Sequence, residues 1–371
     1  MERVLVTGGL GFIGSHTVDR LVEEGYKVTV LDNLEKQVHL GNFPEYKNEK
    51  ADYLHGDIRF RKHWMKALKG VEYIIHLAGA VGIGQSFWQG KKYMDVNVGG
   101  TATLFDILIN NRTMTKDIRK IVVASSKSLY GEGTYKCDEH GKITPLPRKL
   151  EQLRTLQWEI LCPVCGRPTS PIPTKEDKPP QNLNPYSLGK YATERMALFY
   201  SDVMDIPSVA LRYFNVYGPR QSLSNPYTGV VAIFLSRLKN NHPPVLFEDG
   251  KQIRDYIYVK DVADINVSSL TKGSGIYNVG TGKPKSLLDV VSALNRLLNT
   301  NIKPNITGDF RPGDNRHDFA DNSKLILDLK TSEFTNFDDG MKALIAWSKS
   351  QQALDMFERE ESERQKFLVA H

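Results

Sequence analysis

The chain has 371 residues, of which 40% are hydrophobic, so it can bury a large core and we expect two lobes. Its formal net charge of +6 is modest and spread along the chain, which favours a mildly basic enzyme over a nucleic-acid-binding protein. The sequence holds no run of about 18 apolar residues, no leader pattern at its start and only three cysteines. We therefore expect no membrane segment and no disulfide framework, and we expect the protein in the cytoplasm.

The N-terminal segment carries the pattern of a dinucleotide-binding turn. A short β-rich run at residues 4–7 is followed by Gly8, Gly11 and Gly14 and then by a helix with one apolar face. Glycines let the backbone turn sharply and approach a pyrophosphate, whose negative charge is stabilised at the helix N-terminus. Strand, glycines and helix in this order predict a dinucleotide site rather than a plain glycine turn.

An acidic residue follows the second predicted strand. Residues 28–31 form a β-rich run that ends at Asp32, whose carboxylate can accept hydrogen bonds from the adenosine ribose. A carboxylate there repels a 2′-phosphate, so the sequence favours NAD over NADP. Lys36 is the one nearby cation that would suit the phosphate, and it keeps NADP as the alternative.

Strands and helices go on alternating after this unit. Residues 72–80 and 120–126 have the pattern of buried strands, and residues 95–109 between them have that of a helix. We therefore predict an α/β fold, with a doubly wound parallel Rossmann sheet and a smaller C-terminal α/β substrate-binding lobe. In such a fold Asp57 follows a strand and can reach the adenine.

The chemistry is predicted from a hydroxyl-rich strand end and a later helix. The strand at 120–126 ends in serines, and Tyr186 and Lys190 lie four apart on a helical pattern, with Cβ atoms roughly 6 Å apart. An ammonium there lowers the pKa of the tyrosine from about 10 towards that of a general base. The spacing alone is weak evidence, because Tyr46/Lys50 and Tyr256/Lys260 share it, in a polar loop and in a strand-like run respectively.

Six motifs in order carry a family resemblance: TGGLGFIG, ASSKSLYG, YSLGK, RYFNVYGPR, IRDYIYVKDVA and RPGDNRHDFAD. Together they resemble the extended short-chain dehydrogenases that act on nucleotide sugars. The resemblance implies that Ser126 is the hydroxyl partner of Tyr186 and Lys190 in catalysis. It implies a nucleoside-diphosphate sugar as substrate, and a homodimer that pairs through the helices near residues 94–110 and 186–204.

The resemblance and the motifs together give two sets of binding residues. The predicted cofactor-binding residues are Gly8, Gly11, Phe12, Ile13, Gly14, Asp32, Asn33, Asp57, Ile58, Leu77, Ala78, Ala80, Asn97, Tyr186, Lys190 and Phe214. The predicted substrate-binding residues are Ser128, Asn215, Arg220, Arg254, Arg311 and Asp314. Arg254 and Arg311 are expected to hold the diphosphate, because guanidinium binds phosphate oxygens in pairs.

The two residues that follow the catalytic serine narrow the set of reactions that the enzyme could catalyse. Related 4,6-dehydratases carry an Asp-Glu pair there, and decarboxylases keep an acid nearby, whereas this chain has Lys127 and Ser128. Neither side chain supplies the acid that those reactions need. We therefore expect an NAD-dependent nucleotide-sugar 4-epimerase, with the UDP-glucose/UDP-galactose type and a nucleotide 4-keto-sugar reductase as alternatives.

A long segment, residues 133–175, separates the serine strand from the tyrosine helix and contains every cysteine. Cys137 and His140 form a C-x2-H pair, and after 21 residues Cys162 and Cys165 form a C-x2-C pair. Three thiolates and one imidazole are a closed ligand set, typical of structural zinc. A redox CxxC pair and three unliganded cysteines are the alternatives, but the glycine and prolines after Cys165 argue against the helix that a redox pair needs.

This insertion also resembles that of the dTDP-L-rhamnose 4-epimerases in its position before the catalytic helix. Because its two ends connect to catalytic elements, we expect it to roof the sugar pocket. The expected division is therefore 1–132 with 176–218 and 255–283 for the NAD-binding domain, 133–175 for the zinc-knuckle insertion, and 219–254 with 284–371 for the substrate-binding lobe and tail.

The substrate-binding lobe is expected to contain helices near 220–241 and 286–299, separated by short strands near Val245 and Ile276. The GTGK sequence at 280–283 lacks the spacing of a phosphate loop and is expected to form a turn. The charge-dense tail is expected to be a solvated helix. His76 and His317 are expected to be structural.

Overall fold

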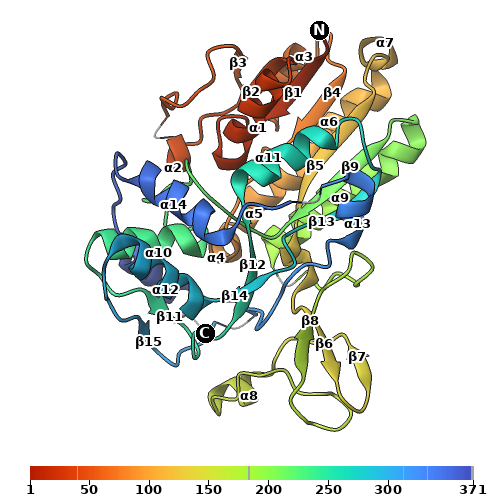
Figure 1. Ribbon diagram of the computed structural model, residues 1–371. Coiled ribbons are helices and arrows are strands. Elements are labelled where there is room, and N and C mark those ends of the chain that lie inside the picture. Colours follow the sequence, from red (N-terminus) through yellow and green to blue (C-terminus); the bar gives the residue numbers. More distant parts are fainter. Residues whose placement is uncertain (40, 183, 312, 332, 369–371) are drawn as a thin grey trace.

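The computed structural model describes residues 1–39, 41–182, 184–311, 313–331 and 333–368. A seven-stranded sheet runs through the larger domain in the order β13-β9-β5-β4-β1-β2-β3, and all its paired strands are parallel (Figure 1). Its strands are β1 (Arg3–Thr7), β2 (Lys27–Asp32), β3 (Asp52–His55), β4 (Tyr73–His76), β5 (Lys120–Ser126), β9 (Ser208–Tyr213) and β13 (Gly275–Val279). The α/β, doubly wound parallel architecture predicted from the sequence is confirmed.

Helices cover both faces of this sheet, which explains why β4, β5 and β9 are buried along their whole length. Val4 and Val6 pack in the cluster on the side of α1 (Phe12–Glu23) and α11 (Val259–Ser268). Leu5, between them, belongs to the opposite cluster, on the side of α3 (Arg61–Ala67), α6 (Gly100–Asn110) and α9 (Pro185–Met204). The shorter helices of this domain are α2 (Lys36–His39), α4 (Ile83–Trp88), α5 (Gly90–Tyr93) and α7 (Arg112–Thr115).

Helix α9 begins at a strong local signal. Asn184 accepts a hydrogen bond from the Ser187 backbone, the Ser187 hydroxyl lies 3.2 Å from the Asn184 nitrogen, and Pro185 occupies the first helical position. This capping box fixes the start of the helix and therefore the position of Tyr186, one residue later.

The smaller lobe contains α10 (Val230–Lys239), α12 (Leu287–Leu298), α14 (Phe337–Ser348) and the strand pair β11 (Val245–Leu246) and β15 (Asn305–Ile306). A second small sheet pairs β10 (Asn215–Tyr217), β12 (Ile253–Tyr258) and β14 (Pro284–Ser286). The strand expected near Ile276 is not part of this lobe: it is β13, which extends the large sheet beside β9, and α13 (Ser323–Leu329) packs against it.

The turn at 280–283 is filled by a side chain of the protein itself. Asp255 accepts hydrogen bonds from the backbone nitrogens of Thr281 and Gly282, each at 2.8 Å. The donors that a phosphate loop would offer are used, so a turn is the correct interpretation.

The insertion forms a separate small lobe at one end of the molecule (Figure 1). Its strands are β6 (Thr134–Cys137), β7 (Gly141–Ile143) and β8 (Ser170–Ile172), with α8 (Leu150–Arg154) beside them. Tyr135, Ile143 and Ile160 form its own buried core together with the cysteines. We call residues 133–175 the insert from here on.

The tail helix α15 (Phe357–Leu368) is not simply solvated. The guanidinium of Arg237 lies 4.7 Å from the centre of the Phe357 ring, and Tyr227 donates a hydrogen bond to Glu363.

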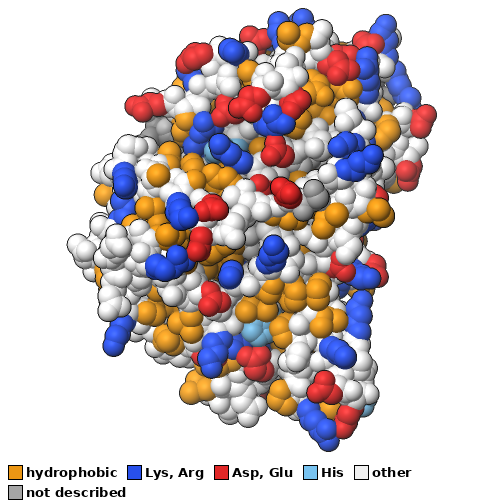
Figure 2. Space-filling model, viewed as in Figure 1, with side chains coloured by type: hydrophobic (Ala, Val, Ile, Leu, Met, Phe, Trp, Pro, Cys, Tyr) orange, Lys and Arg blue, Asp and Glu red, His pale blue; other side chains and the backbone are white. Residues whose placement is uncertain are grey.

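On the face drawn in Figure 2, acidic and basic side chains are mixed rather than segregated by sign. None of the described helices has the length and apolar character needed to cross a bilayer.

Candidate functional site

One cavity of about 1200 Å³ lies where the carboxyl ends of the parallel strands meet the smaller lobe. It opens around β1, whose neighbours β2 and β4 continue in opposite directions along the sheet, the position where α/β sheets bind ligands. Every cofactor, catalytic and substrate residue predicted from the sequence lines this cavity except Asn97.

The glycine turn is built for close backbone approach. Gly8 has φ +68°, and a Cβ atom there would lie 2.8 Å from Ala78 Cα. A Cβ atom on Gly14 would collide with the carbonyl oxygen of Gly8. Helix α1 starts at Phe12 after Gly11, which offers no side-chain cap, so its first backbone N–H groups remain available for an anion.

Asp32 is held in the orientation that a ribose contact needs. It is 7% exposed, and its two carboxylate oxygens accept hydrogen bonds from the backbone nitrogens of Leu10 (3.0 Å) and Leu34 (2.9 Å). Each oxygen keeps a second lone pair for a hydroxyl donor. Lys36, the residue that kept NADP as an alternative, is not among the described residues that line the cavity.

Asp57 lies at the same end of the cavity, paired with a neighbouring arginine. Arg59 Nη2 lies 2.6 Å from Asp57 Oδ2. Burial opposes ionisation, but the hydrogen bonds from Arg59 lower the pKa of Asp57 below its ordinary value. The group is therefore a carboxylate acceptor, as an adenine or ribose contact requires.

Asn97 does not line the cavity but supports its wall. It is 2% exposed, accepts a hydrogen bond from the Ala80 nitrogen at 2.8 Å and donates one to the Ala80 oxygen at 3.1 Å. It lies in a π-helical turn, Met94–Gly99, inserted between α5 and α6. The wider turn directs the amide onto the Ala80 backbone, a use of π-turns common at functional sites.

Ser126, Tyr186 and Lys190 meet on the wall of the cavity. Ser126 ends β5 and lies close enough to Tyr186 to lower the pKa of that tyrosine, and Lys190 Nζ donates to the Ala124 oxygen at 3.1 Å. The other tyrosine–lysine pairs with this spacing do not form such a site, since Lys50 and Lys260 are exposed and neither lines the cavity.

The expected lowering of the Tyr186 pKa is not observed. Burial raises the pKa of Tyr186, and the hydrogen bond from Ser126 opposes this only in part. Burial also lowers the pKa of Lys190 to about 8. Both groups are therefore destabilised in their charged forms, which is the cost of removing a proton-transfer pair from water.

The burial of Lys190 predicts a pH-dependent stability. Because its pKa falls from 10.5 to about 8, the unfolded chain binds the extra proton more tightly between these values, and the folded state gains relative stability as the pH rises. We expect Lys190→Met to be more stable than the wild type at neutral pH by up to roughly 3 kcal/mol. The difference should shrink towards about pH 10.5.

Urea unfolding of both proteins across this pH range measures the difference in stability. Lys69→Met, on the surface, is the control, and a difference that stays constant with pH would contradict the assignment.

Arg254 and Arg311 line the part of the cavity beyond the catalytic residues. Arg254 donates to the carbonyl oxygens of Ile253 (2.8 Å), Asn315 (2.8 Å) and Arg316 (2.9 Å). The Arg311 guanidinium lies 4.3 Å from the centre of the Phe247 ring. Two fixed guanidinium groups at one end of the cavity suit a diphosphate.

Arg220 lies elsewhere than expected. It pairs with Asp19 of α1 at 2.7 Å and lies 5.0 Å from the centre of the Tyr46 ring, whose hydroxyl donates to the Leu10 oxygen. The ion pair with α1 draws it to the glycine turn. Its guanidinium therefore lies beside the glycine turn, and its part in substrate binding stays a prediction.

Two residues beside Arg254, Gln252 and Tyr256, were not predicted as part of the site. Arg254 and Tyr256 alternate along β12, and Gln252 comes directly before the strand, two residues from Arg254. All three line the cavity. Gln252 and Tyr256 are 5% and 4% exposed, and within the described chain their Oε1 and hydroxyl atoms have no hydrogen-bond partner. Buried polar atoms of this kind normally have partners, so a bound ligand is expected to supply them. The period of two in QIRDY was the available signal.

We predict that Tyr256→Phe raises KM for the nucleotide sugar by about two- to tenfold with little change in kcat, since one ligand hydrogen bond is lost. Steady-state kinetics test this. Tyr258→Phe, on the same strand but outside the cavity lining, should behave as the wild type. An unchanged KM in Tyr256→Phe would exclude the contact.

Lys127, the residue that argued against dehydration, forms a buried ion pair with Asp318. Burial opposes the charge on Asp318, but Lys127 and Arg254 hold its pKa below the ordinary value. Asp318 is therefore a committed carboxylate and cannot serve as the acid that water loss requires. The buried Lys127–Asp318 ion pair therefore agrees with the sequence, which has no acid at positions 127 and 128 to support dehydration.

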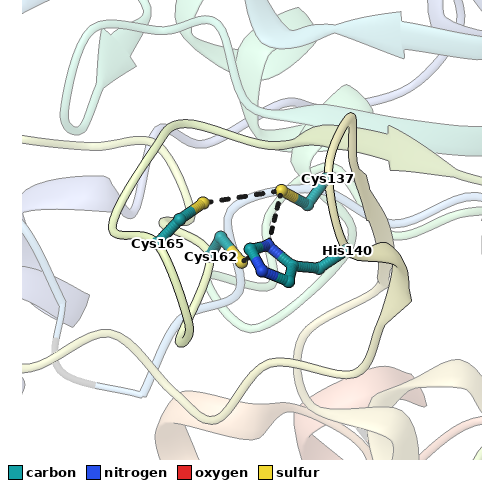
Figure 3. A group of neighbouring side chains, drawn as sticks. All are labelled: Cys137, His140, Cys162 and Cys165. Atoms are coloured by element: carbon teal, nitrogen blue, oxygen red, sulfur yellow. Dashed lines mark hydrogen bonds between the residues drawn. The ribbon is translucent and has the colours of Figure 1, made fainter.

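The four predicted metal ligands come together. Cys137 and His140 lie on the β6–β7 hairpin, and Cys162 and Cys165 come from the facing loop (Figure 3). Cys137 Sγ is 3.7 Å from Cys165 Sγ and 3.6 Å from His140 Nδ1, and Cys162 Sγ is also 3.6 Å from His140 Nδ1. Tetrahedral zinc with Zn–S near 2.3 Å would place its sulfurs about 3.8 Å apart, whereas a disulfide needs about 2.05 Å. The donor set fits zinc.

The expected roof over the sugar pocket is not formed. Among the described residues that line the cavity, none lies between 133 and 175. The insert instead projects from the end of the molecule (Figure 1). Its connection to two catalytic elements brings its ends near the site, and its own β-sheet then leads the rest of the lobe away.

The comparisons with known proteins agree with this site. The family model described as "NAD dependent epimerase/dehydratase family" matches residues 4–150 and 162–280. The chain is 32% identical over 356 residues to a dTDP-L-rhamnose 4-epimerase from Burkholderia thailandensis, covering 93% of this chain and 94% of that protein.

Two solved structures are similar over nearly the whole chain. A UDP-N-acetylglucosamine 4-epimerase from Methanobrevibacter ruminantium, in complex with UDP-N-acetylmuramic acid, has a TM-score of 0.77 and 30% identity and covers 95% of this chain and 99% of its own. A Thermus thermophilus UDP-glucose 4-epimerase in complex with NAD has a TM-score of 0.74 and 28% identity, covering 94% and 100%. With its glycine turn, its acidic strand end and its serine, tyrosine and lysine in one cavity, the chain belongs to the NAD-dependent epimerase/dehydratase family.

Proposed function

We propose that this protein is an NAD-dependent nucleotide-sugar 4-epimerase. The observation that carries the proposal is the meeting of Ser126, Tyr186 and Lys190 in a cavity that also contains Asp32 at one end and Arg254 at the other. The similar proteins described above are 4-epimerases of nucleotide sugars, two of them with UDP sugars or NAD in their structures.

The residues present account for the steps of such a reaction. The chemistry that NAD would supply when bound is reversible hydride transfer: the hydride removed from C4 is the one returned to it, so the reaction needs no other oxidant or reductant. Ser126 and Tyr186 hold the sugar O4, and Tyr186 takes its proton as C4 is oxidised. The 4-keto sugar turns over about its diphosphate, which Arg254 and Arg311 hold, and Tyr186 returns the proton to O4 when the opposite face is reduced.

The proposed first substrate is dTDP-L-rhamnose, because the Burkholderia thailandensis relative acts on it and is matched along its length. The experiment adds no cofactor: the purified protein is incubated with dTDP-L-rhamnose, UDP-glucose or UDP-galactose, and the anomeric and H4 protons are followed by NMR. A second sugar at equilibrium supports an epimerase and identifies its substrate. No conversion of any of the three, with oxidation of NAD(P)H by a 4-keto sugar, would instead indicate a reductase.

We also propose that the insert binds one structural zinc ion through Cys137, His140, Cys162 and Cys165. The four donors leave no open position, so the ion would stabilise the lobe and take no part in the chemistry. The three cysteines form no disulfide with one another, and zinc-binding thiolates suit a reducing compartment, which supports a cytoplasmic location. We further propose a homodimer through the helices near 94–110 and 186–204, where Leu188, Phe199 and Val203 are exposed.

A further inference from the structure

The insert is joined to the substrate-binding lobe by a buried ionic cluster. Arg148 of the insert binds Glu248 with two hydrogen bonds of 2.8 and 3.0 Å, and these side chains are 2% and 3% exposed. The same guanidinium donates to the backbone carbonyl oxygen of Asp314 at 3.0 Å. Since both charged groups are removed from water, each depends on the other's position.

A second residue of the insert, Glu159, binds Arg316 and His317, which follow closely after Asp314. Glu159 accepts hydrogen bonds from Arg316 Nη2 at 2.6 Å and Nε at 3.1 Å, and its other oxygen lies 2.9 Å from His317 Nε2. Arg316 is fully buried and also binds Asp249 and Glu248. A buried guanidinium with this many acidic partners fixes the backbone that carries it.

The backbone of that segment is also held directly. The His317 nitrogen donates to the Tyr135 hydroxyl of the insert at 3.0 Å, and the Arg316 nitrogen donates to Glu132 at 2.8 and 2.9 Å. Tyr135 in turn donates to Glu132 at 3.1 Å. The insert therefore contacts residues 314–317 through both side chains and backbone.

The opposite side of this segment orients Arg254. The carbonyl oxygens of Asn315 and Arg316 accept two of the Arg254 hydrogen bonds, and the His317 ring accepts one from the Ile253 nitrogen at 3.1 Å. A guanidinium has five N–H donors in a rigid plane. Where these carbonyls lie thus decides where the remaining donors of Arg254 point in the cavity.

We propose that the insert is a positioning element for the anionic end of the substrate, with Glu159 as a positioning residue that acts through Arg316 and His317 on Arg254. The inference rests on the proposed function, which supplies a nucleoside diphosphate as the ligand. It replaces the roof expected from the sequence: the insert acts on the cavity from behind its wall.

The test uses Glu159→Gln in the full-length protein, with Glu151→Gln on the exposed face of α8 as the matched control. Titration calorimetry with UDP and with dTDP gives Kd, steady-state kinetics give KM and kcat, and the bound NAD of each preparation is measured. Tyr135→Phe, which removes the hydroxyl that holds His317, is the second variant should Glu159→Gln fold poorly.

We expect Glu159→Gln to weaken nucleotide binding and raise KM by about three- to tenfold, with kcat and bound NAD unchanged, and Glu151→Gln to match the wild type. In an Arg254→Lys background the effect of Glu159→Gln should shrink, because both changes act on the same contact. Wild-type Kd in both folded variants, or fully additive effects with Arg254→Lys, would overturn the inference.

The two proposals fail in different ways. Weaker UDP or dTDP binding without any epimerisation would remove the proposed reaction and leave the inference standing. Epimerisation with an unchanged Kd in Glu159→Gln and Tyr135→Phe would do the reverse.

Discussion

Replacing Tyr186 with phenylalanine is expected to lower kcat for epimerisation by about 10²- to 10⁴-fold, the contribution of a positioned acid–base group. Tyr186 lies half-buried beside Ser126, and both residues line the cavity. Bound NAD should be unchanged, because Asp32 and the glycine turn remain intact.

The measurement compares steady-state epimerisation and NAD content in wild type, Tyr186→Phe and Tyr191→Phe. Tyr191 lies on the same helix, and its phenylalanine variant should retain activity. Near-normal turnover in Tyr186→Phe would remove this residue as the base, and loss of NAD along with activity would point to a structural effect instead.

Replacing Cys162 with serine should reduce bound zinc from about one equivalent per chain to a small fraction, since a closed four-ligand site loses one thiolate. In domains of this size, metal binding and folding are coupled, so the insert should become sensitive to protease between residues 133 and 175. The large sheet has its own core and should stay folded.

Elemental analysis and limited proteolysis measure these outcomes, with Val164→Ser as the control because Val164 is 70% exposed between the two cysteines. If the insert acts on Arg254 as proposed, KM in Cys162→Ser should also rise while NAD stays bound. Unaltered zinc content and protease resistance in this variant would exclude the site.

Local patterns in the sequence were sufficient to predict the sheet, the glycine turn and the cluster of three cysteines and one histidine. Gly8, Gly11 and Asp32 belong to one βαβ unit, where neighbours in sequence are neighbours in space. Cys162 and Cys165 need only a single tight turn. Such features depend on short-range geometry, which spacing encodes.

What the sequence could not supply depends on contacts between distant segments. Glu159 and Arg316 are 157 residues apart, and their ion pair has no periodic signature. Asn97 was expected in the cofactor site from the family resemblance, whereas its amide binds the Ala80 backbone from a π-helical turn that has no sequence signal. The position of the insert could not be judged from its connections alone, because its hairpin leads away from the cavity.

The cluster around Arg316 has a thermodynamic consequence for the cell. If metal in the insert strengthens nucleotide-sugar binding by some factor, the nucleotide sugar must strengthen metal binding by that same factor, because coupling between two sites is reciprocal. Protein engaged with substrate would then resist chelation better than idle protein. Such an enzyme would lose its metal first where the nucleotide sugar is scarce. A shortage of the ion would then reduce the amount of active enzyme mainly when little substrate is present.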